Sequence, residues 1–140
     1  MSNFKQRGLS FITIMIIIAL FALVLRFAIE RLMKITIQQN ESNAQSTLKL
    51  ISTALENYAK DHSGAFPLDL SVLTHSNPAY LDKDYLSHSP LKGYEYSCSR
   101  LEASSYSCSA IPVKCKFTGE KVYTVTTGGL VVAESCRGRE

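Results

Sequence analysis

Apolar residues dominate the beginning of the chain. From Leu9 to Leu25 there is no charged residue, and only Ser10 and Thr13 interrupt the apolar run. In a helix this stretch spans about 26 Å, close to the thickness of the hydrocarbon core of a bilayer. The long side chain of Arg26 can reach the lipid headgroups, and residues 27–29 continue the apolar character, so the apolar span is long enough to cross the bilayer. We therefore predict a membrane-spanning segment over residues 9–29.

A second apolar pattern follows a polar patch at residues 38–43. Its positions recur at intervals of three and four residues: Ala44, Leu48, Ile51, Leu55 and Tyr58. This spacing is typical of one face of an α-helix. No Pro or Gly occurs between residues 9 and 63, and Gly64 and Pro67 then predict a stop. We expect one helix of about fifty residues; two helices with a break near Gln38–Asn43 are the alternative.

Residues 64–140 are expected to form a small globular head. Alternating and β-branched segments predict strands in five places: 93–99, 104–113, 114–119, 122–126 and 130–134. Gly128 and Gly129 predict a two-residue hairpin turn, since both accept positive φ. An antiparallel sheet of three or four strands, with one face covering the helical stripe, gives an α+β fold.

All four cysteines lie in this head: Cys98, Cys108, Cys115 and Cys136. None belongs to a C-x-x-C pair, which argues against zinc-ribbon or thioredoxin chemistry. An even number in a small head predicts two disulfides and an oxidising compartment, with free thiols in a cytosolic protein as the alternative. Three pairings are possible. A meander favours Cys98–Cys108, across a turn near residues 100–103, together with Cys115–Cys136.

Candidate chemistry adds little to this picture. The net charge is +3 and the cations are scattered, so nucleic-acid binding is not predicted. His62, His75 and His88 lie beside turn residues without a second ligand at metal spacing. Aspartates at 69, 82 and 84 suggest calcium, but the intervening Lys83 favours a solvated loop. We predict no catalytic residue, metal or cofactor.

The tyrosines of the head are a further candidate surface. They cluster at four positions: Tyr80, Tyr85, Tyr94 and Tyr96. Aromatic side chains in a thin core contribute much of its buried area. We expect these side chains in the core and on the sheet face rather than in a ligand platform.

Two cations precede the apolar run. Lys5 and Arg7 keep the N-terminus cytoplasmic by the positive-inside bias and send the rest of the chain across the membrane. After Leu20 the chain offers neither an A-x-A site nor a lipoprotein cysteine. Removal of the apolar segment as an ordinary signal peptide is therefore not predicted.

A basic leader ending in Gly8, an apolar helix starting at Leu9 and an amphipathic continuation together resemble the class III signal of type IV pilins and type II secretion pseudopilins. In the head, residues 46–73, 80–98 and 121–135 resemble the family's helix end, its loop into the first strand and its closing hairpin. The resemblance implies a leader at 1–8, a transmembrane half-helix at 9–29, an amphipathic half at 30–63 and a head at 64–140.

The resemblance also implies a life cycle. A prepilin peptidase cleaves between Gly8 and Leu9 and methylates Leu9. Before assembly, the chain is a single-pass protein of the inner membrane, with its head in the periplasm or outside the cell. An inner-membrane platform then assembles it with other pilin or pseudopilin subunits. Membrane lipid is its first partner, and its role is structural rather than enzymatic.

One residue departs from the family pattern. The family usually carries a glutamate five residues into the mature helix, where this chain has Thr13. That carboxylate is understood to neutralise a neighbouring subunit's N-terminal ammonium, since an unpaired charge is costly in an apolar core. Thr13 therefore implies a minor or atypical subunit. The family's helix-kinking proline is also absent, with Glu30 near its position.

Three readings of the filament stay open: a secretion pseudopilus, an adhesive pilus and a DNA-uptake filament. Outside the family, one alternative is an uncleaved single-pass protein whose disulfide-tied head binds a ligand or partner. The other is a membrane-tethered enzyme, which the lack of a catalytic constellation argues against.

Overall fold

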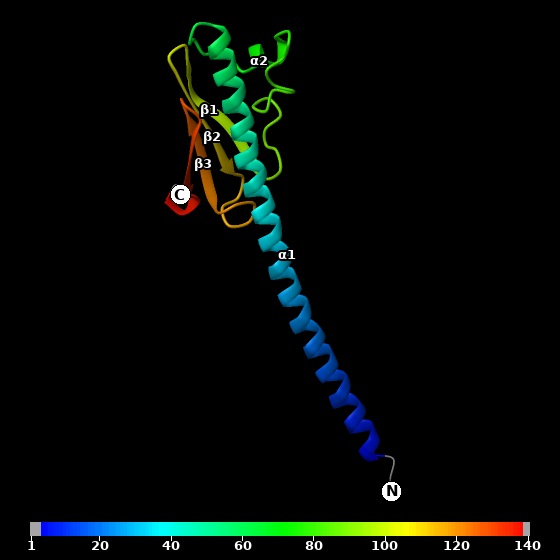
Figure 1. Ribbon diagram of the computed structural model, residues 1–140. Coiled ribbons are helices and arrows are strands. Elements are labelled where there is room, and N and C mark those ends of the chain that lie inside the picture. Colours follow the sequence, from blue (N-terminus) through cyan, green and yellow to red (C-terminus); the bar gives the residue numbers. More distant parts are fainter. Residues whose placement is uncertain (1–3, 139–140) are drawn as a thin grey trace. The chain divides into compact units, whose positions relative to one another are not determined.

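A long helix and a four-stranded sheet make up the protein (Figure 1). The computed structural model describes the backbone of residues 4–138 and the side chains of residues 10–137. The helices are α1 (Phe4–Asp61), α2 (Ser71–His75) and the 3-10 turn η1 (Cys136–Gly138). The strands are β1 (Tyr94–Glu102), β2 (Ser105–Pro112), β3 (Lys121–Thr126) and β4 (Leu130–Ser135). The α+β fold expected from the sequence is confirmed. Two compact units divide between Ile35 and Thr36 and are described separately.

Helix α1 is one continuous helix, as expected, and it is longer than the sequence suggested. It contains 58 residues and begins at Phe4 rather than at Leu9. The alternative, two helices with a break at residues 38–43, is wrong, because α1 runs through this patch. Polar residues of the patch bond to the head: Asn40 donates to the Thr118 carbonyl at 3.0 Å. The helix ends at Asp61, where Gly64 adopts a φ of 87° and donates to the Ala59 carbonyl at 2.7 Å. This is a glycine-terminated helix end.

The apolar stripe of α1 packs on one face of the sheet (Figure 1). Ala44, Leu48, Ile51 and Leu55 are fully buried, and Tyr58 is half-buried. The sheet contributes the buried side chains of Tyr94, Tyr96, Tyr106, Cys108, Ala110, Tyr123 and Val125. The predicted stripe and its predicted partner surface are therefore confirmed.

The strands form an antiparallel meander in the order β1-β2-β3-β4. Thr126 pairs with Leu130, so the last hairpin loop has three residues instead of the predicted two. Thr127 is the additional residue. Its hydroxyl accepts from the Tyr106 amide at 3.0 Å, and this hydrogen bond extends the contact with β2. Gly128 and Gly129 do adopt positive φ, at 90° and 76°.

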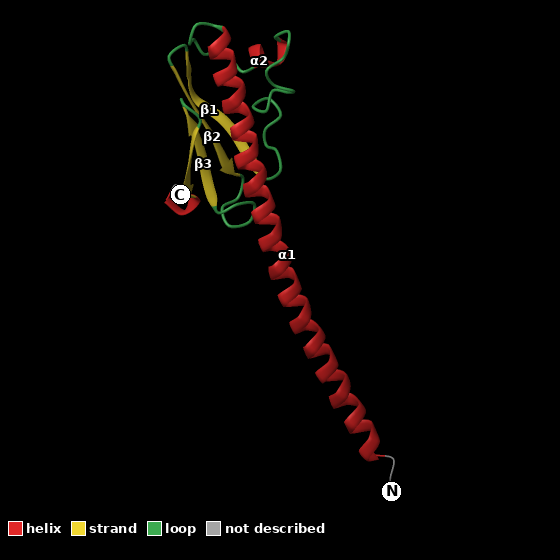
Figure 2. Ribbon diagram, viewed as in Figure 1, coloured by secondary structure: helices red, strands yellow, loops and turns green. Residues whose placement is uncertain are grey.

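The segment 114–119 is a loop and not a strand, which corrects the sequence prediction (Figure 2). The Lys114 carbonyl accepts from the amides of Phe117 at 3.1 Å and Thr118 at 2.9 Å. Lys116 has a φ of 70°, which lies in the left-handed region and outside the β region. The polar and apolar residues that alternate in this segment therefore lie in a tight turn.

Two disulfides close the head. Cys98 and Cys108 are direct partners in the register of β1 and β2. Cys115 in the loop joins Cys136 at the start of η1. This is the pairing favoured in the sequence analysis among the three possible ones. The turn between the first two cysteines lies at residues 103–104, later than the expected 100–103.

Candidate functional site

The most prominent surface feature is the apolar part of α1 before Thr36. The large apolar side chains from Phe11 to Ile35 are between 40% and 65% exposed. The helix contains a window with a mean hydropathy of 2.8 and no buried residue, and it is long and apolar enough to cross a membrane. An apolar surface of this extent marks a site for lipid or protein contact.

Charged side chains gather at one end of this segment. Between Ser10 and Ile35, the charged residues are Arg26, Glu30, Arg31 and Lys34. Arg26 Nε lies 3.7 Å from Glu30 Oε1, and both side chains are exposed. Such charges next to an apolar span are typical of the region where a helix leaves the hydrocarbon.

The leader residues are placed only in part. Gly8 and Leu9 lie within the backbone of α1, which begins at Phe4. The side chains of Lys5, Arg7 and Leu9 are not among the described ones. Thr13 lies in the exposed apolar segment. Cleavage after Gly8 and methylation of Leu9 remain predictions.

Two glutamates of α1 tie the head to the helix. Glu56 Oε1 accepts from the Gly128 amide at 2.8 Å and from the Tyr106 hydroxyl at 3.0 Å. Glu41 Oε1 accepts from the Glu120 amide at 2.9 Å. The sequence prediction missed both residues. Both lie beside the apolar stripe, but no local pattern in the sequence identifies their partners, which are 79 and 72 residues away.

The hydroxyl groups of the buried tyrosines are neutral. Burial raises the pKa of Tyr94, Tyr96, Tyr106 and Tyr123, and the nearby Glu41 carboxylate raises the pKa of Tyr94 further. Tyr94 donates its hydroxyl proton to the Lys121 carbonyl at 2.9 Å. These groups stay protonated at neutral pH, as expected of core residues.

The three histidines are exposed and bonded locally. Nδ1 of His62, His75 and His88 lies 2.9, 2.8 and 2.7 Å from the carbonyl oxygen four residues earlier. In the part of the chain with described side chains, no group of three or more His, Cys, Asp or Glu residues could hold a metal ion.

The three aspartates considered as calcium ligands, Asp69, Asp82 and Asp84, accept hydrogen bonds within turns. Asp69 accepts from the Ser71 amide at 3.1 Å, and this hydrogen bond lowers the pKa of the Asp69 carboxyl. Asp84 accepts from the Leu86 amide at 3.0 Å, and Asp82 from the Tyr85 hydroxyl at 2.9 Å. Such bonds are typical of turn-forming aspartates.

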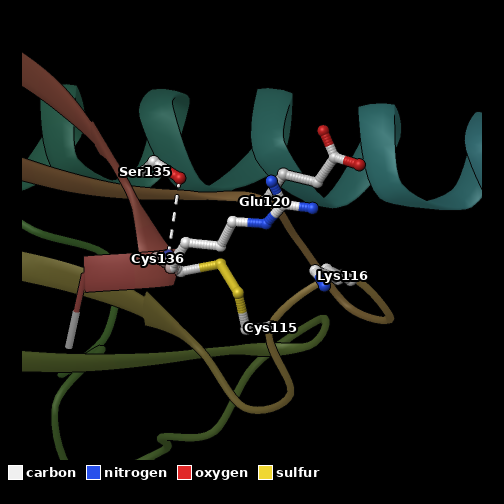
Figure 3. Close-up of a pocket in the computed structure, with 6 residues that line it drawn as sticks. Cys115, Lys116, Glu120, Ser135 and Cys136 are labelled. Atoms are coloured by element: carbon white, nitrogen blue, oxygen red, sulfur yellow. Dashed lines mark hydrogen bonds between the residues drawn. A yellow bond between two sulfur atoms is a disulfide. The ribbon is translucent and has the colours of Figure 1, made fainter. Parts of the chain in front are cut away.

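A pocket of about 300 Å³ lies beside the second disulfide (Figure 3). Its walls come from the loop before β3, the end of β4 and the C-terminal turn η1: Cys115, Lys116, Glu120, Ser135, Cys136 and Arg137. Both cysteines are oxidised, and the Ser135 hydroxyl accepts from the Arg137 amide at 3.4 Å rather than facing a base. This arrangement provides no activated nucleophile.

Comparison with known proteins gives one structural match. No protein-family model matches the sequence, and no curated protein matches it. Among solved structures, the chain is similar to the crystal structure of the non-core minor pilin PilV of Neisseria meningitidis, with 17% sequence identity and a TM-score of 0.45. The match covers 75% of this chain and 92% of that chain.

Proposed function

We propose that this chain is a pilin-like structural subunit, anchored in a membrane as a precursor and later assembled into a filament through its N-terminal helix. The observation that carries the proposal is the exposed apolar segment up to Ile35, which continues within one helix into the stripe that holds the head. A helix with this division has one half free for lipid or neighbouring subunits and one half committed to the fold.

The apolar half of α1, before Thr36, gains free energy when its side chains leave water. Covering one large aliphatic side chain contributes about 1.5–3 kcal/mol relative to water. Lipid tails and the apolar helices of other subunits provide equivalent surroundings for such side chains. The same segment therefore serves as anchor before assembly and as contact surface afterwards. Its charged end, with Arg31 and Lys34, remains at the edge of the apolar layer.

Maturation is the second element of the proposal. A prepilin peptidase cleaves after Gly8 on the cytoplasmic side and methylates Leu9, as the leader's resemblance implies. Lys5 and Arg7 hold the leader on that side. Glycine fits a narrow protease site because it has no side chain. The apolar helix is retained, so the mature chain begins at Leu9.

Thr13 supports a minor position in the filament. A hydroxyl offers no charge to balance an ammonium group in an apolar interior, and an unpaired charge there is costly. Subunits that carry the family's glutamate would form most of the fibre. An inner-membrane platform and a cytoplasmic ATPase supply the assembly machinery. The fibre is a type II secretion pseudopilus or a type IV pilus-like filament.

The substitution Gly8→Ala tests the proposal, with Ser10→Ala as a matched control two residues away. We expect Gly8→Ala to accumulate as the full-length precursor in the membrane fraction and to be lost from sheared filaments. Ser10→Ala should mature normally, because the cleavage site is intact. If both variants and the unaltered chain remain unprocessed in the membrane, the chain is an uncleaved single-pass protein instead.

A further inference from the structure

The loop between β2 and β3 carries an unusual set of exposed side chains. We call residues 113–118 the basic loop. Val113 is 51% exposed and Phe117 is 64% exposed, and the side chains of Lys114 and Lys116 are also exposed. Two apolar side chains and two cations thus point away from the core on one short turn. The core of the head does not require any of the four.

The basic loop is held rigidly. The Lys116 amide donates to the Gly119 carbonyl at 2.8 Å, and the Lys114 amide donates to the Thr118 hydroxyl at 3.0 Å. The Cys115–Cys136 disulfide ties its middle to the C-terminal turn (Figure 3). A rigid loop presents its exposed side chains without the ordering cost that a flexible loop has on binding.

The basic loop lies at the start of the helical part of the head. Asn40 Nδ2 donates to the Thr118 carbonyl at 3.0 Å, and Glu41 accepts from the Glu120 amide at 2.9 Å. In the sequence, Asn40 follows Lys34, the last charged residue before the polar patch, by six residues. At the opposite end of the head, the C-terminal end of α1 lies near the turn between β1 and β2 (Figure 1). After this helix end, Phe66 donates its amide to the carbonyl of Ala103 in that turn at 3.0 Å.

The charge around the basic loop is positive. Lys114, Lys116, Lys121 and Arg137 are exposed there. Two carboxylates lie near them: the exposed Glu120 of the same pocket, and the half-buried Glu41, which accepts from the Glu120 amide. None of the four cations forms a salt bridge among residues 10–137. The cations are therefore available to an external anion.

We propose that the basic loop docks on an anionic lipid surface while the subunit is anchored in the membrane. Phe117 and Val113 enter the headgroup region, and Lys114 and Lys116 contact lipid phosphates. Clustered cations beside exposed aromatic and aliphatic side chains are typical of interfacial membrane contacts. The inference rests on the proposed function, since that function requires the same chain to be anchored in a membrane.

A second copy of the chain is a less suitable occupant. Like charges on two such loops would oppose each other, whereas a surface of anionic lipid complements them. The two exposed apolar side chains are also too few for the apolar core of a stable protein interface. Contact with a second copy is an outcome that the experiment below separates.

Tryptophan scanning of the full-length chain tests this inference, since the natural sequence has no tryptophan. Each variant carries a single reporter and is reconstituted in phosphatidylcholine vesicles with or without phosphatidylglycerol. Phe117→Trp reports on the basic loop, and Leu68→Trp, at a residue 75% exposed near the opposite end of the head, is its matched control. Ile18→Trp reports on the anchor. Quenching by brominated phosphatidylcholine is measured for all three.

We expect strong quenching for Ile18→Trp, and for Phe117→Trp quenching that exceeds the Leu68→Trp value and increases with phosphatidylglycerol. Lys114→Gln and Lys116→Gln, added singly to Phe117→Trp, should each reduce the ratio of docked to free loop by about fivefold in anionic vesicles. These substitutions leave the quenching of the anchor reporter unchanged.

Equal quenching for Phe117→Trp and Leu68→Trp would overturn the inference, while quenching of Ile18→Trp would keep the anchor intact. A shift in Phe117→Trp emission that follows the protein-to-lipid ratio and resists brominated lipid would assign the loop to a second copy. Absence of quenching for Ile18→Trp would contradict the proposed membrane anchor itself.

Discussion

Glutamates 41 and 56 show how single residues join the helix to the sheet. Each carboxylate accepts a backbone amide from a loop beside β3, Glu120 in one case and Gly128 in the other. Hydrogen bonds to a charged acceptor are stronger than neutral ones. The Tyr106 hydroxyl lies between Glu56 and Ser52, 3.0 and 2.9 Å from their oxygens. These bonds fix the position of the apolar stripe on the sheet.

Removal of the Glu56 carboxylate should destabilise the head. We expect Glu56→Ala to lower the free energy of unfolding by about 1–3 kcal/mol, because the Gly128 amide and Tyr106 lose a shared acceptor. Glu56→Gln is the matched control, since its amide oxygen can still accept. Urea unfolding of the full-length chain in detergent measures both. Equal losses for the two variants would mean that the acceptor oxygen is unimportant.

At the residue scale, the sequence predicted apolar positions better than polar ones. Tyr94 and Tyr96 were expected in the core because they alternate along a strand, and both are buried. Glu41 and Glu56 resemble any acid on the solvated side of a helix. Their partners are 79 and 72 residues away, so their role depends on contacts that no local pattern contains.

Among the elements, α1 was the most predictable because its period is regular over many turns. Its continuity through the polar patch at residues 38–43, which the sequence favoured over a break, is confirmed, and Asn40 in that patch bonds to a carbonyl 78 residues later. The error among the elements lies in the segment after β2. Residues 114–119 looked like a strand, but the hydroxyl of Thr118 and the disulfide at Cys115 hold a turn.

The Cys115–Cys136 disulfide should stabilise the head and order the basic loop. It closes a sequence separation of 21 residues, and replacing both cysteines by serine should cost about 3 kcal/mol in the loop-closure account. Trypsin cleavage after Lys114 and Lys116 should accelerate in the variant, because the turn loses its tether.

Serine replacement of Cys98 and Cys108 is the control for this pair. Their separation is 10 residues, and the pairing of β1 and β2 already holds them opposite each other. That variant should lose comparable stability but retain slow cleavage at the basic loop. Equal cleavage rates in the two variants would show that the second disulfide does not order the loop.

On the scale of the whole molecule, the chain divides its apolar surface between two uses. The stripe from Ala44 to Leu55 is buried in the head, whereas the segment before Thr36 is exposed. The sequence predicted this division, since an unbroken apolar run and a periodic stripe are distinct patterns. It did not predict the position of the basic loop, which depends on the contact between Asn40 and Thr118.

The intact mass of the full-length chain, extracted from the membranes of a host with a prepilin peptidase, tests the central claim most directly. The proposal predicts a mature chain that starts at Leu9, carries one added methyl group and keeps the whole apolar helix. A mass that still includes Met1 to Gly8, in a host that processes its other prepilins, would contradict it.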